Sequence, residues 1–260
     1  ARRCGAAALY RSVNGPGDVI MKARNYFLVA ASLLALVAAP ALAYEQGTWI
    51  LRGGVGTVQP KSNGLSSSYD LDGMTITESI DVSDATSMTL TATYMFTQKW
   101  AFDVLAALPF EHDIYMTMSD GSSSEKFKIA ETKQLPATFS IQYHFSPDRD
   151  FQPYAGLGVN WTSFSSTRFV SISDIDPEFE DPEVGIGSSG SLKIDDSYGL
   201  ALQVGGDWKI TERMVLNFDV RWFDVDADTY YVDPSISETI ELGTVKIDPF
   251  FYALNLGFFF

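Results

Sequence analysis

The stretch RMVLNFDVRWFDV, residues 213–225, carries the pattern that decides the fold. Its large apolar side chains recur at every second position, namely at Met214, Leu216, Phe218, Val220 and Trp222. The positions between them include Asn217, Asp219 and Arg221. Because successive side chains of a β-strand point to opposite faces, this spacing predicts a strand with one apolar and one polar face.

Seven further segments repeat this alternation. They span residues 49–55, 88–96, 100–110, 135–145, 155–161, 198–208 and 250–260. In the segment 100–110 the alternation runs without interruption, so we expect Phe110 and then His112 on the apolar face and Glu111 on the inward face. Beyond Tyr44 no segment approaches 18 continuous apolar residues, which excludes helical membrane spans. The pattern therefore predicts eight strands.

Two architectures accommodate such strands. A soluble sandwich turns its apolar faces inward against a second sheet, whereas a membrane barrel turns them outward to lipid. Short breaks at 97–99, 146–150 and 211–212 alternate with long ones near 59–84, 116–128, 170–191 and 232–241. Short turns alternating with long outer loops are typical of outer-membrane barrels. We predict an all-β fold, an eight-stranded antiparallel transmembrane β-barrel with long extracellular loops.

Aromatic side chains favour the membrane barrel as well. They cluster toward the strand ends, where an amphipathic ring suits a membrane interface. Phe260 is a terminal aromatic residue typical of barrels recognised by the outer-membrane barrel assembly machinery, which we therefore expect as a partner. The other expected partners are the lipid bilayer and its lipopolysaccharide.

Composition excludes several classes of function. The chain has 260 residues and a formal net charge of −15, which disfavours a nucleic-acid partner, because phosphate binding needs clustered basic side chains. It contains one cysteine, Cys4, and two histidines, His112 and His144. These counts exclude a disulfide framework and a multi-cysteine or histidine-rich metal site. We expect no cofactor and no resident metal.

The first 43 residues have the pattern of an export signal. From Met21 the chain reads MKARN, a basic start, followed by an apolar stretch at 26–39 and by a small-residue cleavage site that ends at Ala43. This is the plan of a secretory signal peptide. We assign 1–20 to upstream sequence or a misplaced start, 21–43 to a cleaved signal peptide and 44–260 to the barrel. The expected location is a Gram-negative outer membrane.

Five stretches resemble the OmpW family of outer-membrane proteins (OmpW/AlkL-like). They are LAALPFEH at 105–112, LPAT at 135–138, QPYAGLGVNWT at 152–162, DSYG at 196–199 and IDPF at 247–250. The resemblance implies an eight-stranded barrel with a narrow apolar interior, associated with passage of small hydrophobic molecules across the outer membrane. The chain departs from the family pattern mainly in its loops 59–84 and 170–191, which are long and acidic.

Two prolines suggest a route for such a molecule. Pro109 and Pro136 are expected in neighbouring strands, and each lacks the N–H that a strand ladder needs. We hypothesise that they weaken pairing in the barrel wall and let a hydrophobic solute leave sideways. The alternative is a bulge that only shapes the barrel. The residues expected to line the channel and its lateral exit are Leu105, Ala107, Pro109, Pro136, Thr138, Tyr154 and Phe251.

The polar strand faces predict what fills the lumen. An eight-stranded barrel is wide enough for its own side chains or for one small ligand. Small inward residues such as Gly54 and Gly56 either leave a cavity or relieve crowding. Inward charges are expected to neutralise each other as a structural plug of the periplasmic half, the alternative being a conducting ion path. This lumenal charge cluster comprises Arg52, Asp103, Asp207, Asp219 and Arg221.

Two further candidates indicate no catalytic or metal site. The acidic segment 174–183 offers six carboxylates but lacks the spacing of an EF-hand loop, so we interpret it as a solvated loop that exchanges divalent ions with lipopolysaccharide. His112 beside Glu111 is a candidate base near the outer end of its strand, but no Gly-x-Ser-x-Gly motif supplies a nucleophile. We expect no enzyme.

The function predicted from these patterns is passive uptake of small hydrophobic molecules, which enter from outside and leave laterally into the membrane. The alternative is a non-transporting surface barrel for adhesion, receptor binding or envelope stability. A continuous apolar path from the outer mouth to the barrel wall distinguishes the two. The sequence leaves open which solute is taken up.

Overall fold

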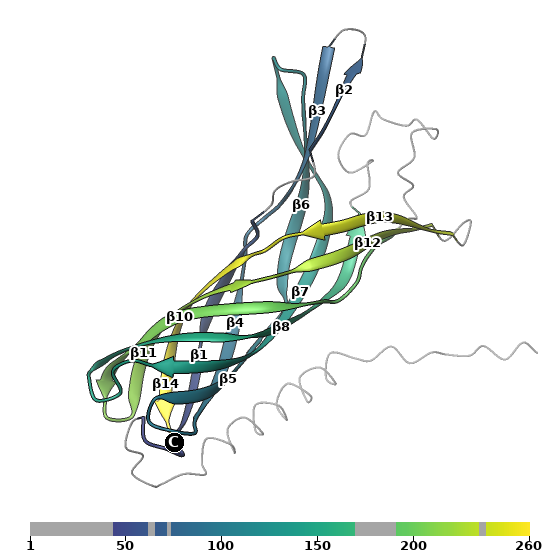
Figure 1. Ribbon diagram of the computed structural model, residues 1–260. Coiled ribbons are helices and arrows are strands. Elements are labelled where there is room, and N and C mark those ends of the chain that lie inside the picture. The colour runs from purple at the N-terminus through teal and green to yellow at the C-terminus, as the bar shows by residue number, and fades with distance from the viewer. Residues whose placement is uncertain (1–43, 62–65, 72–73, 170–190, 234–237) are drawn as a thin grey trace, which may run out of the picture. The chain divides into compact units, whose positions relative to one another are not determined.

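A computed structural model describes residues 44–61, 66–71, 74–169, 191–233 and 238–260, which are built of strands (Figure 1). Their bounds are β1 (Trp49–Gln59), β2 (Ser66–Leu71), β3 (Met74–Val82), β4 (Ala85–Met95), β5 (Trp100–Ala107), β6 (Phe110–Ser119), β7 (Ser124–His144), β8 (Phe151–Phe169), β9 (Ser191–Ile194), β10 (Ser197–Thr211), β11 (Met214–Phe223), β12 (Asp226–Asp233), β13 (Glu238–Lys246) and β14 (Phe250–Phe259). The expected leader at 1–43 and the acidic segment 174–183 lie outside the described residues. Within the described ranges, no helix is long and apolar enough to cross a membrane.

Eight of these strands close into a ring. Each pairs antiparallel with the next in the order β1, β4, β5, β7, β8, β10, β11 and β14, and β14 returns to β1. The closing pairing runs from Ile50↔Phe259 to Gln59↔Phe250. Each of the eight predicted segments corresponds to one of these strands, although the segment 100–110 runs past the end of β5 into β6, so the predicted barrel is confirmed. A closed ring has no unpaired edge strand.

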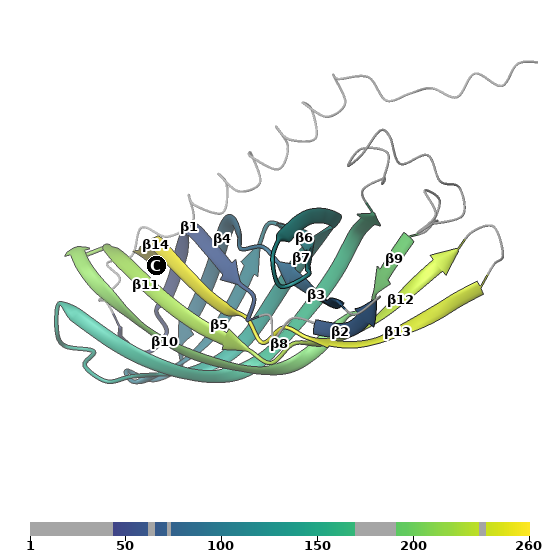
Figure 2. The same cartoon turned by 90° about the horizontal axis from the view of Figure 1, so that it is seen from above.

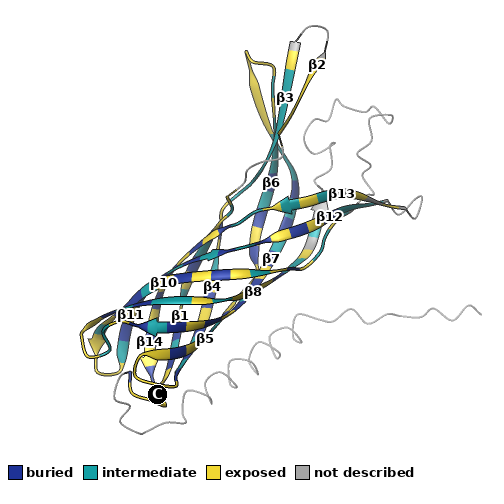
Figure 3. Cartoon of the chain, viewed as in Figure 1, coloured by how far each residue is buried: buried dark blue, intermediate teal, exposed yellow. Residues whose placement is uncertain are grey.

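The outward face of the ring is apolar, and exposed and buried residues alternate along the barrel strands (Figure 3). Apolar side chains that are 50–58% exposed include Val55, Leu90, Leu157, Leu200, Leu202, Phe218 and Leu254. Exposed aromatic rings lie near both ends of the strands, at Trp49, Trp100, Trp208, Trp161 and Tyr198. So large an apolar surface needs an apolar phase such as lipid to cover it.

The two ends of the ring differ. At one end, here called the short-turn end, the strands are joined by turns at 96–99, 145–150 and 212–213. At the other, the long-strand end, the sheet continues through the pairings β2–β3, β3–β6 and β6–β7. A separate sheet of β13, β12 and β9 lies at the same end, where the three strands run side by side (Figure 2). The long connections predicted from the sequence thus contain strands of their own.

The alternation changes phase between β5 and β6. Inward positions are odd-numbered through Leu105, whereas Phe110 and His112 are buried, with 0% and 2% exposure, and Glu111 is exposed. The prediction that Phe110 and His112 face lipid and that Glu111 faces inward is therefore wrong. The cause is the break at residues 108–109, which lie outside both strands and shift the side-chain phase by one residue.

Glycine at position 54 relieves crowding inside the ring. A Cβ there would overlap the carbonyl oxygen of Leu254, whereas a Cβ on the neighbouring, outward-facing Gly53 meets nothing nearer than the Thr89 carbonyl oxygen at 3.9 Å. Gly54→Ala is expected to lower the free energy of unfolding by about 1–3 kcal/mol. Gly53→Ala is the matched control. Urea unfolding in lipid vesicles, followed by tryptophan fluorescence, measures both, and equal effects would contradict the assignment.

Candidate functional site

The five charged residues predicted to face the lumen meet inside the ring. Arg52 donates from Nε to Asp207 Oδ1 at 3.0 Å. Arg221 Nη2 lies 2.9 Å from Asp103 Oδ2 and 2.7 Å from Asp219 Oδ2. The two groups are joined where Arg52 Nη1 lies 3.9 Å from Asp103 Oδ1. All five side chains are at most 3% exposed, and we call them the charge plug.

Neutral side chains donate further hydrogen bonds to the carboxylates of the charge plug. Tyr44 Oη donates to Asp207 Oδ2 at 2.5 Å, and Asn217 Nδ2 donates to Asp207 Oδ1 at 2.8 Å. Gln203 Nε2 donates to both oxygens of Asp219, at 3.1 and 3.0 Å. Buried carboxylates need such partners, because otherwise the cost of removing them from water is not offset. Alternation places Asn217 and Gln203 on the polar face, whereas no pattern pointed to Tyr44, which precedes β1.

A layer of apolar side chains crosses the lumen on the long-strand side of the charge plug. Phe251 packs edge-on against Phe110, with ring centroids 6.3 Å apart, and at a tilt of 32° against Phe223, with ring centroids 6.1 Å apart. Along β11, Phe223 comes two residues after Arg221, on the same inward face. We call this the apolar layer, and its members are Val58, Ala85, Leu105, Phe110, Ala201, Phe223, Val225, Phe251 and Ala253. The lumen therefore holds an apolar layer above an ionic one.

The residues predicted to line a channel are divided among these regions. Leu105 and Phe251 belong to the apolar layer, and Ala107 packs against it. Tyr154 lies instead beside the charge plug, where its hydroxyl accepts a hydrogen bond from an asparagine amide at 3.0 Å. Thr138 is fully buried on the inward face of β7.

Pro109 and Pro136 lie on the two sides of an interruption in the strand ladder of the barrel wall. Pairing of β5 with β7 ends at Leu105, and pairing of β6 with β7 begins at Phe110. The stretch between them includes Pro109 and has no ladder partner on β7, although all of its residues are described. The facing stretch of β7 includes Pro136 and pairs with β8 on its other side. We call residues 106–109 and 135–137 the wall gap.

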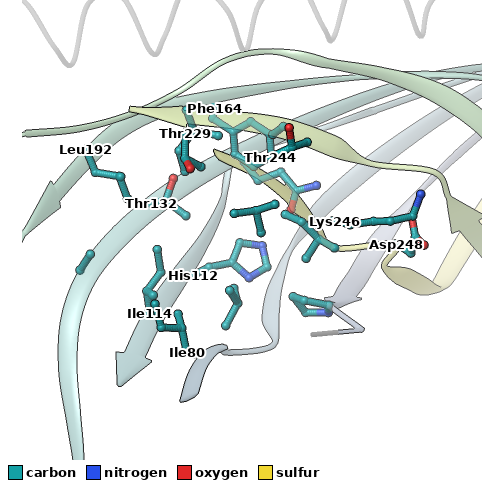
Figure 4. A pocket seen from close by; sticks show the side chains of 18 of the residues that line it. Ile80, His112, Ile114, Thr132, Phe164, Leu192, Thr229, Thr244, Lys246 and Asp248 are labelled. Carbon is teal, nitrogen blue, oxygen red and sulfur yellow. The ribbon is translucent and has the colours of Figure 1, made fainter. Parts of the chain in front are cut away.

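A cavity of about 550 Å³ lies at the long-strand end (Figure 4). Side chains from β3, β6, β7, β8, β9, β12 and β13 line it, and most of the lining is apolar. Apolar members include Ile80, Val82, Ile114, Phe164, Leu192 and Ile194. Phe164 also packs against the apolar layer, so the two regions are contiguous. We call this the outer cavity, and none of the seven residues predicted to line a channel is among the described residues that line it.

Sequence reasoning missed the outer cavity because it treated the long connections as loops. A signal was present in one of them and just before another. Ile80 and Val82 flank Asp81 in β3, and Val225 and Ala227 alternate with aspartates at the start of β12. This period of two is the ordinary signature of a strand with one buried face.

The polar side chains that line this largely apolar cavity include one from β6, His112, and one from β7, Gln134. His112 lies among the labelled residues in Figure 4, with Ile80 and Ile114 to one side. Its Nδ1 is 2.7 Å from the carbonyl oxygen of Ser83. Burial lowers the pKa of His112 below its ordinary value of 6.5, so the ring is neutral at pH 7. Gln134 also lines the cavity, and it is 3% exposed.

Carboxylates gather at the edge of the outer cavity. Asp224, Asp226 and Asp248 have oxygen atoms within 4.8 Å of one another, the one such group that the described residues form. Lys246 already supplies a positive charge to them, with Nζ 3.3 Å from Asp226 and 3.7 Å from Asp224. The arrangement is thus an ion-paired cluster in the described structure.

A closed ring of eight antiparallel strands, apolar outside and ionic within, defines a transmembrane β-barrel of the outer-membrane class. In this class the short turns face the periplasm and the long connections face outward. The outward side chains of β7 fit this orientation. On the same face of the strand, the apolar Leu135 gives way toward the long-strand end to Lys133, which forms an ion pair with Glu111. His112 and the outer cavity therefore lie beyond the band of outward-facing apolar side chains of the ring, which we call the apolar belt.

Comparison with known proteins identifies the family. The OmpW family profile matches residues 45–260. Outer membrane protein W of Vibrio cholerae is 34% identical over 232 residues, 88% of this chain and 96% of that protein. Its counterpart in Escherichia coli K12 is 30% identical over 234 residues, 90% and 98%. The crystal structure of OprG from Pseudomonas aeruginosa is 31% identical with a TM-score of 0.65, covering 85% of this chain and 99% of that one. The chain belongs to the OmpW family.

The family assignment confirms the resemblance seen in the sequence and the predicted location. Relatives over nearly the whole chain are outer-membrane proteins, and the protein is embedded in the lipid bilayer of the outer membrane. The apolar belt is the surface that contacts the lipid.

Proposed function

We propose that the protein is a passive channel through which small hydrophobic molecules enter the outer membrane from outside and leave sideways into the lipid. The observation that carries the proposal is the wall gap, an interruption of the strand ladder between residues 106–109 and 135–137 next to an apolar cavity at the outer end. Passage is expected to need no cofactor and no energy source, and we expect no catalytic activity.

The course of the lumen supports a sideways exit. A solute that moved straight through the ring would have to cross the apolar layer and then displace the buried ion pairs of the charge plug. Gln134 lines the outer cavity and is also the β7 residue at the cavity-side boundary of the wall gap. The gap thus begins where the cavity ends, and the outward-facing Leu108 and Leu135 place it at the lipid-facing surface.

The chemistry of the walls favours an apolar solute. The outer cavity has the size of a small-molecule site and a mostly hydrophobic lining. Transfer of an apolar molecule into it is favourable in proportion to the surface removed from water. The expected partners are the solute, the surrounding lipopolysaccharide and, during biogenesis, the barrel assembly machinery.

A surface role without transport is the second candidate. The paired strands β2, β3, β6 and β7 extend the sheet beyond the ring (Figure 1), and their ends carry exposed polar side chains such as Ser67, Asp70 and Glu125. Such an extension suits adhesion, receptor binding or envelope stability. In that case the wall gap would have no role in uptake.

Restoring the missing N–H groups is the direct test. Pro109→Ala with Pro136→Thr is expected to slow uptake of N-phenylnaphthylamine, a hydrophobic fluorescent probe, severalfold, because ladder hydrogen bonds then narrow the gap. The rate is measured in proteoliposomes as the rise in probe fluorescence. Pro147→Ala, in a turn at the short-turn end, is the control for loss of a proline. Unchanged uptake in the double variant would remove the lateral exit and favour the surface role.

A further inference from the structure

Two buried nitrogen atoms in the outer cavity have no hydrogen-bond partner. They are Nε2 of His112 and Nε2 of Gln134. The two residues are 2% and 3% exposed, and both line the cavity. A buried polar group without a partner is costly, which sets these two atoms apart from the apolar walls around them.

The two atoms have opposite hydrogen-bonding roles. The Ser83 carbonyl oxygen 2.7 Å from His112 Nδ1 can only accept, so Nδ1 carries the proton and donates it. Since burial keeps the ring neutral, His112 Nε2 has a free lone pair and is an acceptor. Burial is the largest influence on this pKa, and the Ser83 carbonyl, the Gln134 side chain and the nearby carboxylates of Asp84 and Asp113 all oppose it. Gln134 Nε2 is an amide nitrogen and donates.

The backbone places these two groups on the same wall. His112 is opposite Thr132 in the β6–β7 register, and Gln134 is opposite Phe110. His112 and Gln134 are therefore diagonal neighbours on one face of adjacent strands, a separation that long side chains bridge. The Gln134 side chain lies close enough to the imidazole to raise the pKa of His112, but neither Nε2 atom has a partner in hydrogen-bonding geometry. The acceptor and the donor thus form one polar spot.

Three threonines of the outer cavity already have hydrogen-bond partners. Thr229 Oγ1 donates to the Gly243 carbonyl oxygen at 2.7 Å, and Thr244 Oγ1 donates to Asp228 at 2.6 Å. Thr132 Oγ1 is 3.0 Å from the hydroxyl of Thr167. The hydroxyl groups of these threonines therefore have hydrogen-bond partners within the protein, whereas the two nitrogen atoms of the polar spot do not.

We infer that the outer cavity selects small apolar molecules that carry one hydroxyl group, whose O–H donates to His112 Nε2 while its oxygen accepts from Gln134 Nε2. The inference rests on the proposed function and names the class of its solute. A hydroxyl group is the simplest group that both donates and accepts. A hydrocarbon leaves both nitrogens unpaired, and a carboxylate has no proton to donate to His112 Nε2.

The chain offers a clean spectroscopic test, because it contains two histidines. Full-length protein labelled with ¹⁵N-histidine is placed in lipid bilayers, and 1-octanol or n-octane is added at equal mole fraction in the lipid. Octanol is expected to shift the Nε2 resonance of His112 toward that of a hydrogen-bonded acceptor, whereas octane leaves it in place. His144 is buried inside β7 and serves as the internal reference. Equal shifts with both compounds, or none with octanol, would overturn the inference.

A binding measurement separates this inference from the proposed function. Displacement of N-phenylnaphthylamine from the protein is expected to favour octanol over octane by about tenfold, the ratio that ordinary hydrogen bonds provide. His112→Leu with Gln134→Leu is expected to abolish that preference and keep octane binding. Thr132→Val, in the same wall, is the control that should keep the preference. If octane and octanol displace the probe equally from the wild type, the inference is wrong but the proposed channel function is retained. If neither compound displaces the probe and uptake is absent, the proposed function is wrong as well.

Discussion

Arg52→Leu is expected to lower the free energy of unfolding by about 3–5 kcal/mol, the cost of leaving a buried charge without its partner. Arg52 is 1% exposed, and its guanidinium contacts Asp207 through two nitrogen atoms. The same guanidinium donates to Thr93, which in turn donates to Asp103. Its loss therefore leaves one carboxylate unpaired and disrupts the hydrogen bonds of another.

Reversible urea unfolding in lipid vesicles measures this loss. Arg213→Leu is the matched control, because Arg213 is exposed in a short turn and its replacement is expected to change stability by less than about 0.5 kcal/mol. Adding Asp207→Asn to Arg52→Leu removes the unpaired charge and is expected to recover part of the stability. A loss of less than about 1 kcal/mol in Arg52→Leu would show that water reaches the charge plug.

Filling the outer cavity is expected to give the largest loss of uptake. Ala130 and Ala227 line it from β7 and β12, and they are 1% and 2% exposed. In the variant Ala130→Phe with Ala227→Phe, two rings occupy space that a solute needs, and the uptake rate of a hydrophobic probe should fall by about an order of magnitude, as for a blocked ligand pocket. The empty volume accepts the rings, so the barrel should still fold.

Proteoliposomes with N-phenylnaphthylamine give the uptake rate, and resistance of the folded band to SDS shows that the barrel is intact. Ala92→Phe adds the same ring to the lipid-facing side of β4 and should leave uptake unchanged. Full uptake through the filled cavity would show that solutes reach the membrane by another path. It would also separate the role of the cavity from that of the wall gap, because the proline double variant alters the wall gap and leaves the cavity intact.

The barrel strands could be predicted because each of their two faces meets a different phase. Lipid outside and an ionic lumen inside impose a period of two, and this period placed all five residues of the charge plug on the inward face. Their mutual pairing could not be predicted, since it depends on the order and register in which the ring closes.

The phase shift, the outer cavity and the polar spot could not be predicted from the periodicity of the sequence. The break at residues 108–109 moves Phe110 and His112 from the outer to the inner face, and a shift of one residue leaves the local pattern of apolar residues intact. The outer cavity is formed by strands from distant parts of the sequence, so its contents follow from tertiary pairing. The polar spot made by His112 and Gln134 depends both on the phase shift at residues 108–109 and on the tertiary pairing of the strands.

Closure of the ring through β1 and β14 constrains the order of assembly. β14 pairs with β1 on one side and with β11 on the other, so both pairings wait for residues 250–259. Until then β1 and β11 are open edges, and an open edge in hydrocarbon leaves a row of backbone groups without hydrogen bonds. A half-inserted barrel is therefore a high-energy species. Insertion into the membrane has to be concerted with closure, or the two edges have to be capped until the last strand arrives.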